Sequence, residues 1–193
     1  MSERLPPLPP AEWPAEMREA LAALRPPSPR LPLPERRDDR PKGRNLLGLL
    51  AHHPELARAY HTFNGHVLFA TTLTIRQREI LILRVGARRD AEYEWLQHKV
   101  IGLDNGMTIE EIDATRTGPE ADVWSPFDAA LVRAVDELVD DACIGEETYA
   151  VLSAELSPQQ LMDVVFTVGA YEILAMALRT FDVVVDPDLA GWK

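Results

Sequence analysis

Apolar residues recur at intervals of three and four from Asn45 to near the end of the chain, and strand-type alternation is almost absent. This spacing gathers apolar side chains on one face of a helix. The pattern therefore predicts an all-α protein. The expected helices span residues 45–51, 54–70, 74–88, 91–105, 108–116, 126–143, 146–155 and 158–183.

Several of these helices carry explicit start and stop signals. Thr108 with Glu111 matches a capping box, and Ser125 before Pro126 places a hydroxyl at the N-cap and proline at the first helical position. Gly106 suits the left-handed residue that ends a helix. These signals support separate helices joined by short loops, as in a helical bundle.

Residues 1–44 differ from the rest, because eleven of the 16 prolines fall within residues 1–41. A short helix is expected over residues 11–24, but residues 26–40 mix proline with charge and lack apolar periodicity. We expect a proline-rich arm over residues 1–44, which wraps a neighbour or stays mobile, and one helical domain over residues 45–193.

The composition narrows the classes of partner and compartment. A net charge of −11 makes a nucleic-acid surface improbable, because phosphate binding needs clustered Lys and Arg. No signal segment or membrane span is expected, and the single cysteine, Cys143, permits neither an internal disulfide nor a thiolate metal cluster. We expect a cytoplasmic protein that binds no nucleic acid and needs no metal or cofactor.

Candidate chemistry begins at Glu79, which has apolar neighbours on its own helical face. Burial raises the pKa of a carboxyl and makes it useful for proton transfer near neutrality. A structural ion pair with an arginine such as Arg84 or Arg179 is an equally weighted alternative.

Glu94 and His98 are four residues apart and share one face of the following helix. A carboxylate at this distance can orient an imidazole for general acid–base catalysis. The same spacing also occurs in ordinary surface pairs that stabilise a helix. Zinc binding is a minor alternative, because a third and a fourth ligand at helical spacing are missing.

This segment resembles the signature hairpin of the carboxymuconolactone decarboxylase and alkylhydroperoxidase D-like superfamily. The resemblance covers roughly residues 45–181 and implies a helical bundle that assembles as a dimer, trimer or hexamer. It rests on Arg78-Glu79-Ile80, Tyr93-Glu94-Trp95-x-x-His98, Gly102 and Gly106-Met107-Thr108.

One feature of the family's peroxidase branch is missing. In that branch a glutamate lies nineteen residues before a histidine, and a Cys-x-x-Cys pair ends four residues before the histidine. Glu79 and His98 match the two ends, but Ala91 and Glu94 occupy the cysteine positions. Peroxide reduction through a thiolate is therefore disfavoured, and Cys143 is expected to be a small buried hydrophobe in a helix.

The resemblance implies acid–base catalysis by Glu79, Glu94 and His98, as decarboxylation or isomerisation of a small lactone or keto-acid-like substrate. One alternative is a non-catalytic, oligomeric small-molecule-binding or scaffold protein. A second alternative is peroxidase or peroxiredoxin-type antioxidant activity, as in relatives that keep the cysteine pair.

Two segments supply substrate-pocket candidates, and a further candidate lies on the last helix. Tyr60 and Asn64 lie four residues apart on the helix before the hairpin, and Tyr93 and Trp95 flank Glu94. For Tyr60 and Asn64, surface or capping roles are weighted above a pocket role.

The last helix, over residues 158–183, is apolar on most of its circumference, which is typical of a core helix or a subunit contact. Glu172 and Arg179 interrupt the apolar run, so this helix is not expected to span a membrane. Glu172 is a further pocket candidate, but an ion pair with Arg179, or with an arginine across a subunit contact, is weighted above that role. Together with the arm, this apolar helix favours a homo-oligomer.

Overall fold

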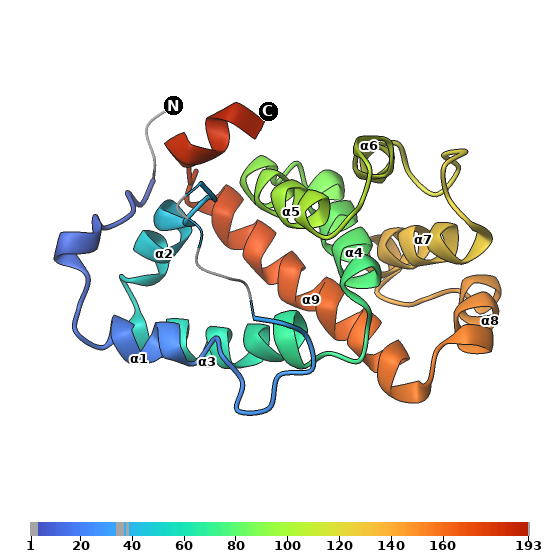
Figure 1. The fold of residues 1–193 in the computed structure, drawn as a ribbon, viewed down its shortest axis with the longest axis horizontal. Coiled ribbons are helices and arrows are strands. Elements are labelled where there is room, and N and C mark those ends of the chain that lie inside the picture. Colours follow the sequence, from blue (N-terminus) through green and yellow to red (C-terminus); the bar gives the residue numbers. More distant parts are fainter. Residues whose placement is uncertain (1–3, 34–36, 38, 193) are drawn as a thin grey trace. The chain divides into compact units, whose positions relative to one another are not determined.

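The computed structural model describes residues 4–33, 37 and 39–192, and within these residues the chain forms helices without any strand (Figure 1). The all-α fold predicted from the apolar spacing is confirmed. In chain order the elements are η1 (Pro10–Glu12), α1 (Met17–Ala22), α2 (Arg44–Leu50), α3 (Pro54–Gly65), the π-helix η2 (His66–Ala70), α4 (Ile75–Arg88), α5 (Glu92–Asp104), α6 (Ile109–Thr117), α7 (Pro126–Asp141), α8 (Glu146–Glu155), α9 (Pro158–Thr180) and η3 (Pro187–Trp192).

The chain divides into two compact units. The first contains Met1–Thr71 and Met176–Lys193, and the second contains Thr72–Ala175. The expected division at residue 44 stays a prediction. Residues 1–3, 34–36 and 38, which fall in the expected arm, lie outside the described residues.

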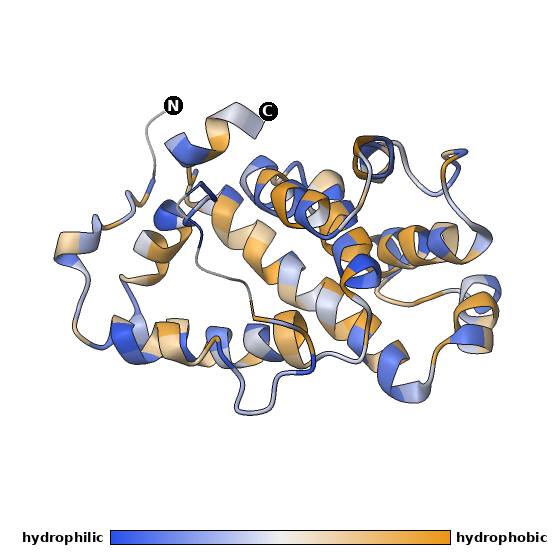
Figure 2. Cartoon of the chain, viewed as in Figure 1, coloured by the Kyte–Doolittle hydropathy of each residue, from blue (hydrophilic) through white to orange (hydrophobic). Residues whose placement is uncertain are grey.

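Helix α4 is the central element of the second unit and packs against α5, α6 and α7. Every residue from Arg78 to Gly86 is buried, so this helix is enclosed on all sides along its middle. Figure 2 shows hydrophobic residues recurring along α4 and α7, as the apolar periodicity predicts. Because α4 is enclosed, any polar side chain it carries must find its partners inside the protein.

The first unit is built around contacts between α1 and α3. Met17, Ala20, Ala51 and Ala57 form its buried cluster. Backbone hydrogen bonds also tie the proline-rich stretch to this unit, because the N–H groups of residues 30 and 31 both donate to the carbonyl of Phe69.

Most predicted helices are present, and the differences have local causes. The helix expected over residues 11–24 is interrupted, because Trp13 precedes Pro14 and takes an extended conformation between η1 and α1. The helix expected to run to Ala70 changes to π winding after Gly65. Helix α7 ends at Asp141, because Ala142 is left-handed with φ 57°.

Helix α9 is the described helix whose length and apolarity would suffice to cross a membrane. Half of its most apolar stretch is buried inside the structure, and core helices of folded domains have the same length and composition. These properties agree with the expected core helix and are weak evidence for a membrane span.

Candidate active site

The hairpin of α4 and α5 positions the predicted catalytic residues. Thr74 starts α4 with a complete capping box to Gln77, which fixes the first turn of the helix. Gly86 lets the two helices approach closely, because a Cβ atom there would lie 3.3 Å from the Cβ and backbone nitrogen of Trp95. The backbone therefore holds Glu79 and His98 on facing helices.

Glu79 and His98 are brought together, as the resemblance implied. The carboxylate of Glu79 is fully buried, and its Oε2 lies 2.7 Å from Nδ1 of His98. Its Oε1 accepts hydrogen bonds from Nε of Arg78 at 2.8 Å and from Nη2 at 2.6 Å. The arginine partner of Glu79 is thus the residue before it, whereas Arg84, suggested as a partner, binds Asp136.

The protonation of Glu79 differs from the sequence-based expectation. Burial acts to raise its pKa, but the charges of His98 and Arg78 and the hydrogen bonds from both hold the pKa below its ordinary value. The expectation of a raised pKa at Glu79 was therefore wrong. An ionised carboxylate only accepts hydrogen bonds, so Nδ1 of His98 must be the donor.

Two further observations define the surroundings of His98. The imidazole is 5% exposed and meets the ring of Tyr171 edge-on, with the centroids 4.9 Å apart and the planes at 89°. Within the described residues, its second nitrogen, Nε2, has no hydrogen-bond partner. With Nδ1 holding a proton toward Glu79, a neutral ring has its lone pair on Nε2.

Glu94 does not orient His98, which corrects the pairing expected from their spacing of four residues. Its side chain is 1% exposed, and neither carboxyl oxygen has a hydrogen-bond partner among the described residues. Burial raises the pKa of Glu94 well above its ordinary value, and the nearby charge of Glu172 raises it further. The acid with the raised pKa is therefore Glu94.

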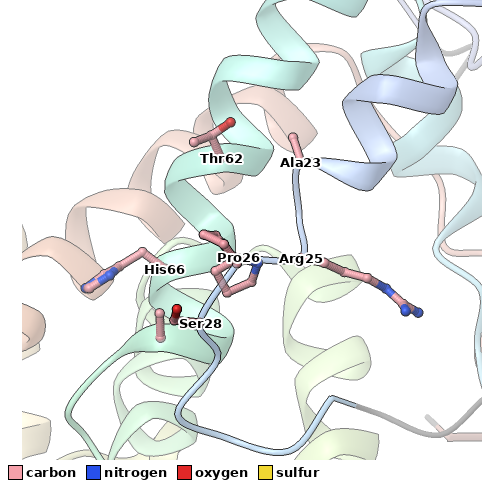
Figure 3. Close-up of a pocket in the computed structure, with 8 residues that line it drawn as sticks. Ala23, Arg25, Pro26, Ser28, Thr62 and His66 are labelled. Atoms are coloured by element: carbon pink, nitrogen blue, oxygen red, sulfur yellow. The ribbon is translucent and has the colours of Figure 1, made fainter.

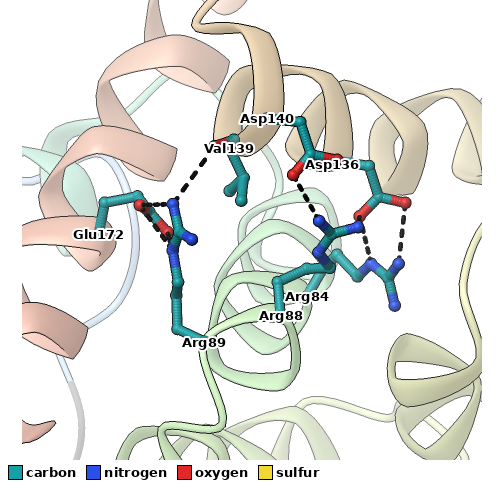
Figure 4. A network of polar contacts seen from close by, with 7 residues as sticks. All are labelled: Arg84, Arg88, Arg89, Asp136, Val139, Asp140 and Glu172. Atoms are coloured by element: carbon teal, nitrogen blue, oxygen red, sulfur yellow. Dashed lines mark hydrogen bonds and ion pairs between the residues drawn. The ribbon is translucent and has the colours of Figure 1, made fainter.

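Glu172 forms a partly buried ion pair with Arg89, which lies at the end of α4 (Figure 4). Nε and Nη2 of Arg89 lie 2.6 to 2.9 Å from the two carboxylate oxygens, and Nη2 also donates to the carbonyl of Val139. Glu172 thus forms an ion pair with an arginine, as expected, but the partner is Arg89 and not Arg179. The sequence offered no signal for Arg89, because 83 residues separate the partners.

The aromatic neighbours of Glu94 are buried in packing. Tyr93 is 4% exposed and Trp95 is 3% exposed. The indole N–H of Trp95 donates to Oγ1 of Thr115 at 3.1 Å, and the guanidinium of Arg116 lies 3.8 Å from its ring centroid. Trp95 therefore joins α5 to α6, and a role in a substrate pocket stays a prediction.

Tyr60 and Asn64 belong to α3 in the first compact unit, where Asn64 is buried. Their predicted role in substrate binding stays a prediction. A cavity of about 450 Å³ opens in the same unit (Figure 3), and neither residue is part of its lining. That lining comprises Ala23, Arg25, Pro26, Pro27, Ser28, Thr62, His66 and Ala70.

Two residues that the sequence did not single out resemble Glu94. Oε1 of Gln97 and Oγ1 of Thr167 are also buried without a hydrogen-bond partner among the described residues. Gln97 lies three residues after Glu94 on α5, and Thr167 lies on α9 four residues before Tyr171. Their side-chain types carry no sequence signal, so the buried atoms alone identify them.

Two observations concern metal and thiol chemistry. Among the described residues, no group of three or more His, Cys, Asp or Glu side chains is arranged to hold a metal ion. Cys143 is exposed and follows the end of α7, so its expected place as a buried residue within that helix was wrong.

A family model described as the carboxymuconolactone decarboxylase family matches residues 54–137. The matched stretch runs from α3 to within α7 and contains Glu79, Glu94 and His98. No curated protein sequence matches the chain.

Several solved structures share the fold. A protein of unknown function from Agrobacterium tumefaciens, whose suggested role is antioxidant defence as an alkylhydroperoxidase D, has a TM-score of 0.65 at 17% identity, over 71% of this chain and 94% of that chain. An uncharacterised peroxidase-related protein from Ralstonia eutropha has a TM-score of 0.65 at 15% identity, over 75% and 77%. A second uncharacterised peroxidase-related protein, from Silicibacter, has a TM-score of 0.67 at 14% identity, over 77% of this chain and 80% of that chain. At these identities the likeness establishes the fold alone.

Proposed function

Because the chain belongs to the carboxymuconolactone decarboxylase and alkylhydroperoxidase D-like superfamily, we propose that it catalyses proton transfer on a small lactone or keto-acid-like substrate. Acid–base groups can perform both decarboxylation and isomerisation of such a substrate without a cofactor. The chain's single cysteine lies outside the hairpin, so the Cys-x-x-Cys chemistry of related peroxidases does not apply.

Each of the three residues has a separate role in this proposal. Glu79 is a positioning residue, because its carboxylate holds His98 through Nδ1. Nε2 of His98 accepts a proton from the carbon beside the substrate carbonyl, and the C–H electron pair moves onto the carbonyl oxygen. The neutral carboxyl of Glu94 donates a hydrogen bond to that oxygen as negative charge develops.

The same groups account for decarboxylation. The bond to the departing carboxylate breaks, its electron pair moves onto the carbonyl oxygen beside Glu94, and carbon dioxide leaves. A protonated His98 then returns a proton from Nε2 to the carbon. In isomerisation His98 returns the abstracted proton to another carbon of the substrate, and after decarboxylation water reprotonates His98. Electrons and protons therefore balance in both reactions without an oxidant or reductant.

The observation that carries this proposal is the contrast between two buried acids of the hairpin: Glu79 is bonded to His98 and Arg78, and Glu94 has no hydrogen-bond partner among the described residues. Contacts lower the pKa of Glu79, and burial raises the pKa of Glu94. Paired acids with pKa values moved apart are typical of acid–base active sites, where one group stays ionised and the other supplies a proton.

Burial favours a second candidate function. Glu79, Glu94 and His98 are each no more than 5% exposed, so a substrate reaches them only after local opening. A non-catalytic oligomeric scaffold or binding protein, in which the three residues form a structural cluster, needs no such opening. The unpartnered oxygens of Glu94 support the catalytic proposal, because a purely structural cluster gains nothing from leaving them unsatisfied.

Two simple probes test the catalytic proposal. Carbon dioxide release from acetoacetate measures decarboxylation, and deuterium exchange beside the carbonyl of γ-butyrolactone, followed by NMR, measures proton transfer. His98→Ala should lower either rate by about 10²–10⁴-fold, and Glu79→Gln should also lower it. His52→Ala and Glu120→Gln, at exposed positions, serve as controls. Unchanged rates in His98→Ala or Glu79→Gln would overturn the proposal.

The triple variant Glu79→Gln, Glu94→Gln and His98→Phe tests the structural alternative. If this variant unfolds, and neither probe changes the melting temperature of the unmodified protein, the non-catalytic function replaces the catalytic one. Peroxidase activity through the remaining thiol is tested with hydrogen peroxide, because unchanged peroxide turnover in Cys143→Ser eliminates it.

Exposed apolar residues on α9 support the expectation that the chain forms a homo-oligomer. Met162, Phe166 and Ile173 are large apolar residues that are 51–60% exposed on this helix, and exposed Gly169 lies between them. Their spacing of four, three and four residues matches the stripe through which helices of two copies pack. Phe166→Asp should lower the mass measured by analytical ultracentrifugation, whereas Tyr149→Asp, at an exposed position on α8, should leave it unchanged.

A further inference from the structure

Three side chains in the second unit keep buried oxygen atoms without hydrogen-bond partners among the described residues. These are both carboxyl oxygens of Glu94, Oε1 of Gln97 and Oγ1 of Thr167. Glu94 and Thr167 are each 1% exposed, so bulk water does not satisfy them. Buried polar atoms are nearly always paired in proteins, and a group of exceptions needs a cause.

Glu94 and Gln97 lie on α5 and Thr167 lies on α9, and we call the region where these two helices meet the α5–α9 seam. Glu94, Gln97 and His98 share a face of α5, because they are separated by three and four residues. That face contacts α9 through the rings of His98 and Tyr171, and the charge of Glu172 on α9 also acts on Glu94. Thr167 lies one helical turn before Tyr171 and therefore on the same face of α9.

Full charges beside this seam are already balanced. The carboxylate of Glu79 is bound to Arg78, and that of Glu172 is bound to Arg89. Burial also favours the neutral form of Glu94. With His98 neutral, a ligand that brought a net negative charge into the seam would lose its hydration without gaining a cation to replace it.

The unpartnered groups suit a neutral ligand with both a donor and an acceptor. A protonated carboxyl has one O–H donor and one acceptor oxygen, and the hydroxyl of Thr167 offers both as well. A carbonyl with an N–H or O–H group beside it, as in an amide or an enol, can form two hydrogen bonds with Glu94 at once. The carbonyl accepts one from the O–H of the carboxyl, and the N–H or O–H donates one to the other carboxyl oxygen. A carboxylate lacks the donor.

We propose that the α5–α9 seam binds an uncharged carbonyl compound with an adjacent hydrogen-bond donor and discriminates against the corresponding carboxylate anion. The inference rests on the proposed function and narrows it, because an uncharged substrate has no carboxylate to lose. Proton transfer beside a neutral carbonyl, as in enolisation or isomerisation, is then the reaction of this site, and decarboxylation is not.

Acetoacetamide and acetoacetate are a matched pair of probes, since they have the same carbon skeleton and differ in charge. Ligand-observed NMR titration against the full-length protein should show binding of acetoacetamide that is at least about tenfold tighter than that of acetoacetate. Equal or tighter binding of acetoacetate, or no binding of acetoacetamide at any soluble concentration, overturns the inference.

Variants locate the binding in the seam. Thr167→Val and Glu94→Leu should weaken acetoacetamide binding, whereas Glu94→Gln, whose amide keeps a donor and an acceptor, should retain it. Thr117→Val, at an exposed position on α6, is the control for loss of a hydroxyl. Unchanged binding in both Thr167→Val and Glu94→Leu overturns the assignment to the seam, and circular dichroism checks that each variant is folded.

Deuterium exchange separates this inference from the proposed function. Selective binding of acetoacetamide without exchange at its central carbon overturns the catalytic function and leaves the binding inference standing. Exchange that depends on His98, together with equal binding of both probes, keeps the catalytic function and overturns the inference.

Discussion

Two buried glutamates on adjacent helices have equal access to water and opposite surroundings. Glu79 on α4 is 0% exposed, and its two oxygens accept hydrogen bonds from Arg78 and His98. Glu94 on α5 is 1% exposed, and its two oxygens have no hydrogen-bond partner in the described chain. The pKa of Glu79 is lowered, and the pKa of Glu94 is raised.

The comparison indicates that contacts, and not burial alone, decide the direction in which the pKa of each acid moves. Burial raises the pKa of both carboxyls, but at Glu79 the neighbouring cations and donors outweigh it. The paired carboxylate of Glu79 has the properties of a structural anchor that also orients an imidazole. The unpartnered carboxyl of Glu94 lowers the stability of the fold, which is typical of a functional site.

The largest expected effect follows from removing the satisfied acid. Glu79→Leu takes away the carboxylate that balances Arg78, so the variant should lose about 3–5 kcal/mol of unfolding free energy. Urea denaturation measures this loss. The control Glu120→Leu breaks an exposed ion pair with Arg133 and should cost no more than about 1 kcal/mol. A loss at Glu79 as small as the control's would mean that the cluster does not anchor the fold.

Removing Glu94 should have the opposite effect on the unfolding free energy. Glu94→Leu replaces an unsatisfied carboxyl with an apolar group of similar size, so the variant should gain about 1–3 kcal/mol of unfolding free energy. Urea denaturation at pH 7 measures the gain, and the same variant should lose activity on the probes of proton transfer. A destabilised Glu94→Leu protein would indicate that this acid is structural.

The helices of this fold could be predicted because their signals are local. Apolar spacing and caps such as Thr108 with Glu111 depend on residues within a few positions of one another, and the structure keeps that capping box. The contacts of the site are not local in this sense. Spacing on one helix suggested that Glu94 orients His98, but the carboxylate that reaches the ring comes from α4, nineteen residues earlier.

The arginine partner of Glu172 could not be predicted from the sequence either. Arg179 is seven residues away on α9, about two turns of the same helix, and was the nearest arginine to consider. The actual partner, Arg89, reaches Glu172 because the turn after α4 lies beside α9. Such pairs depend on how helices pack, which the apolar pattern does not specify.

The pH dependence of stability distinguishes the two acids further. In the unfolded chain Glu94 ionises near its ordinary pKa of 4.5, and in the folded protein it ionises at a higher pH. Between these values only the folded state keeps the proton, so the unfolding free energy falls by about 1.4 kcal/mol per pH unit as pH rises. Glu79 has the opposite sign, because its lowered pKa gives stability that is lost as pH falls through the folded value.

Urea denaturation between pH 4 and pH 9 isolates the contribution of Glu94 by subtraction. Glu94→Gln cannot ionise, so the loss of stability on raising the pH should be absent in this variant. Glu110→Gln, at an exposed position on α6, should keep the wild-type profile. Parallel profiles for the wild type and Glu94→Gln would show that Glu94 has no raised pKa.

The smallest effect on stability is expected at Arg89, which balances the charge of Glu172 from a half-exposed position. Arg89→Met should cost less than about 1 kcal/mol of unfolding free energy. The unbalanced charge of Glu172 should then raise the pKa of Glu94 further, which carbon-13 NMR of labelled glutamate carboxyls can follow. Arg88→Met, which breaks pairs with Asp136 and Asp140 (Figure 4), is the matched control. If the pKa of Glu94 moves equally in both variants, Arg89 has no specific influence on the unsatisfied acid.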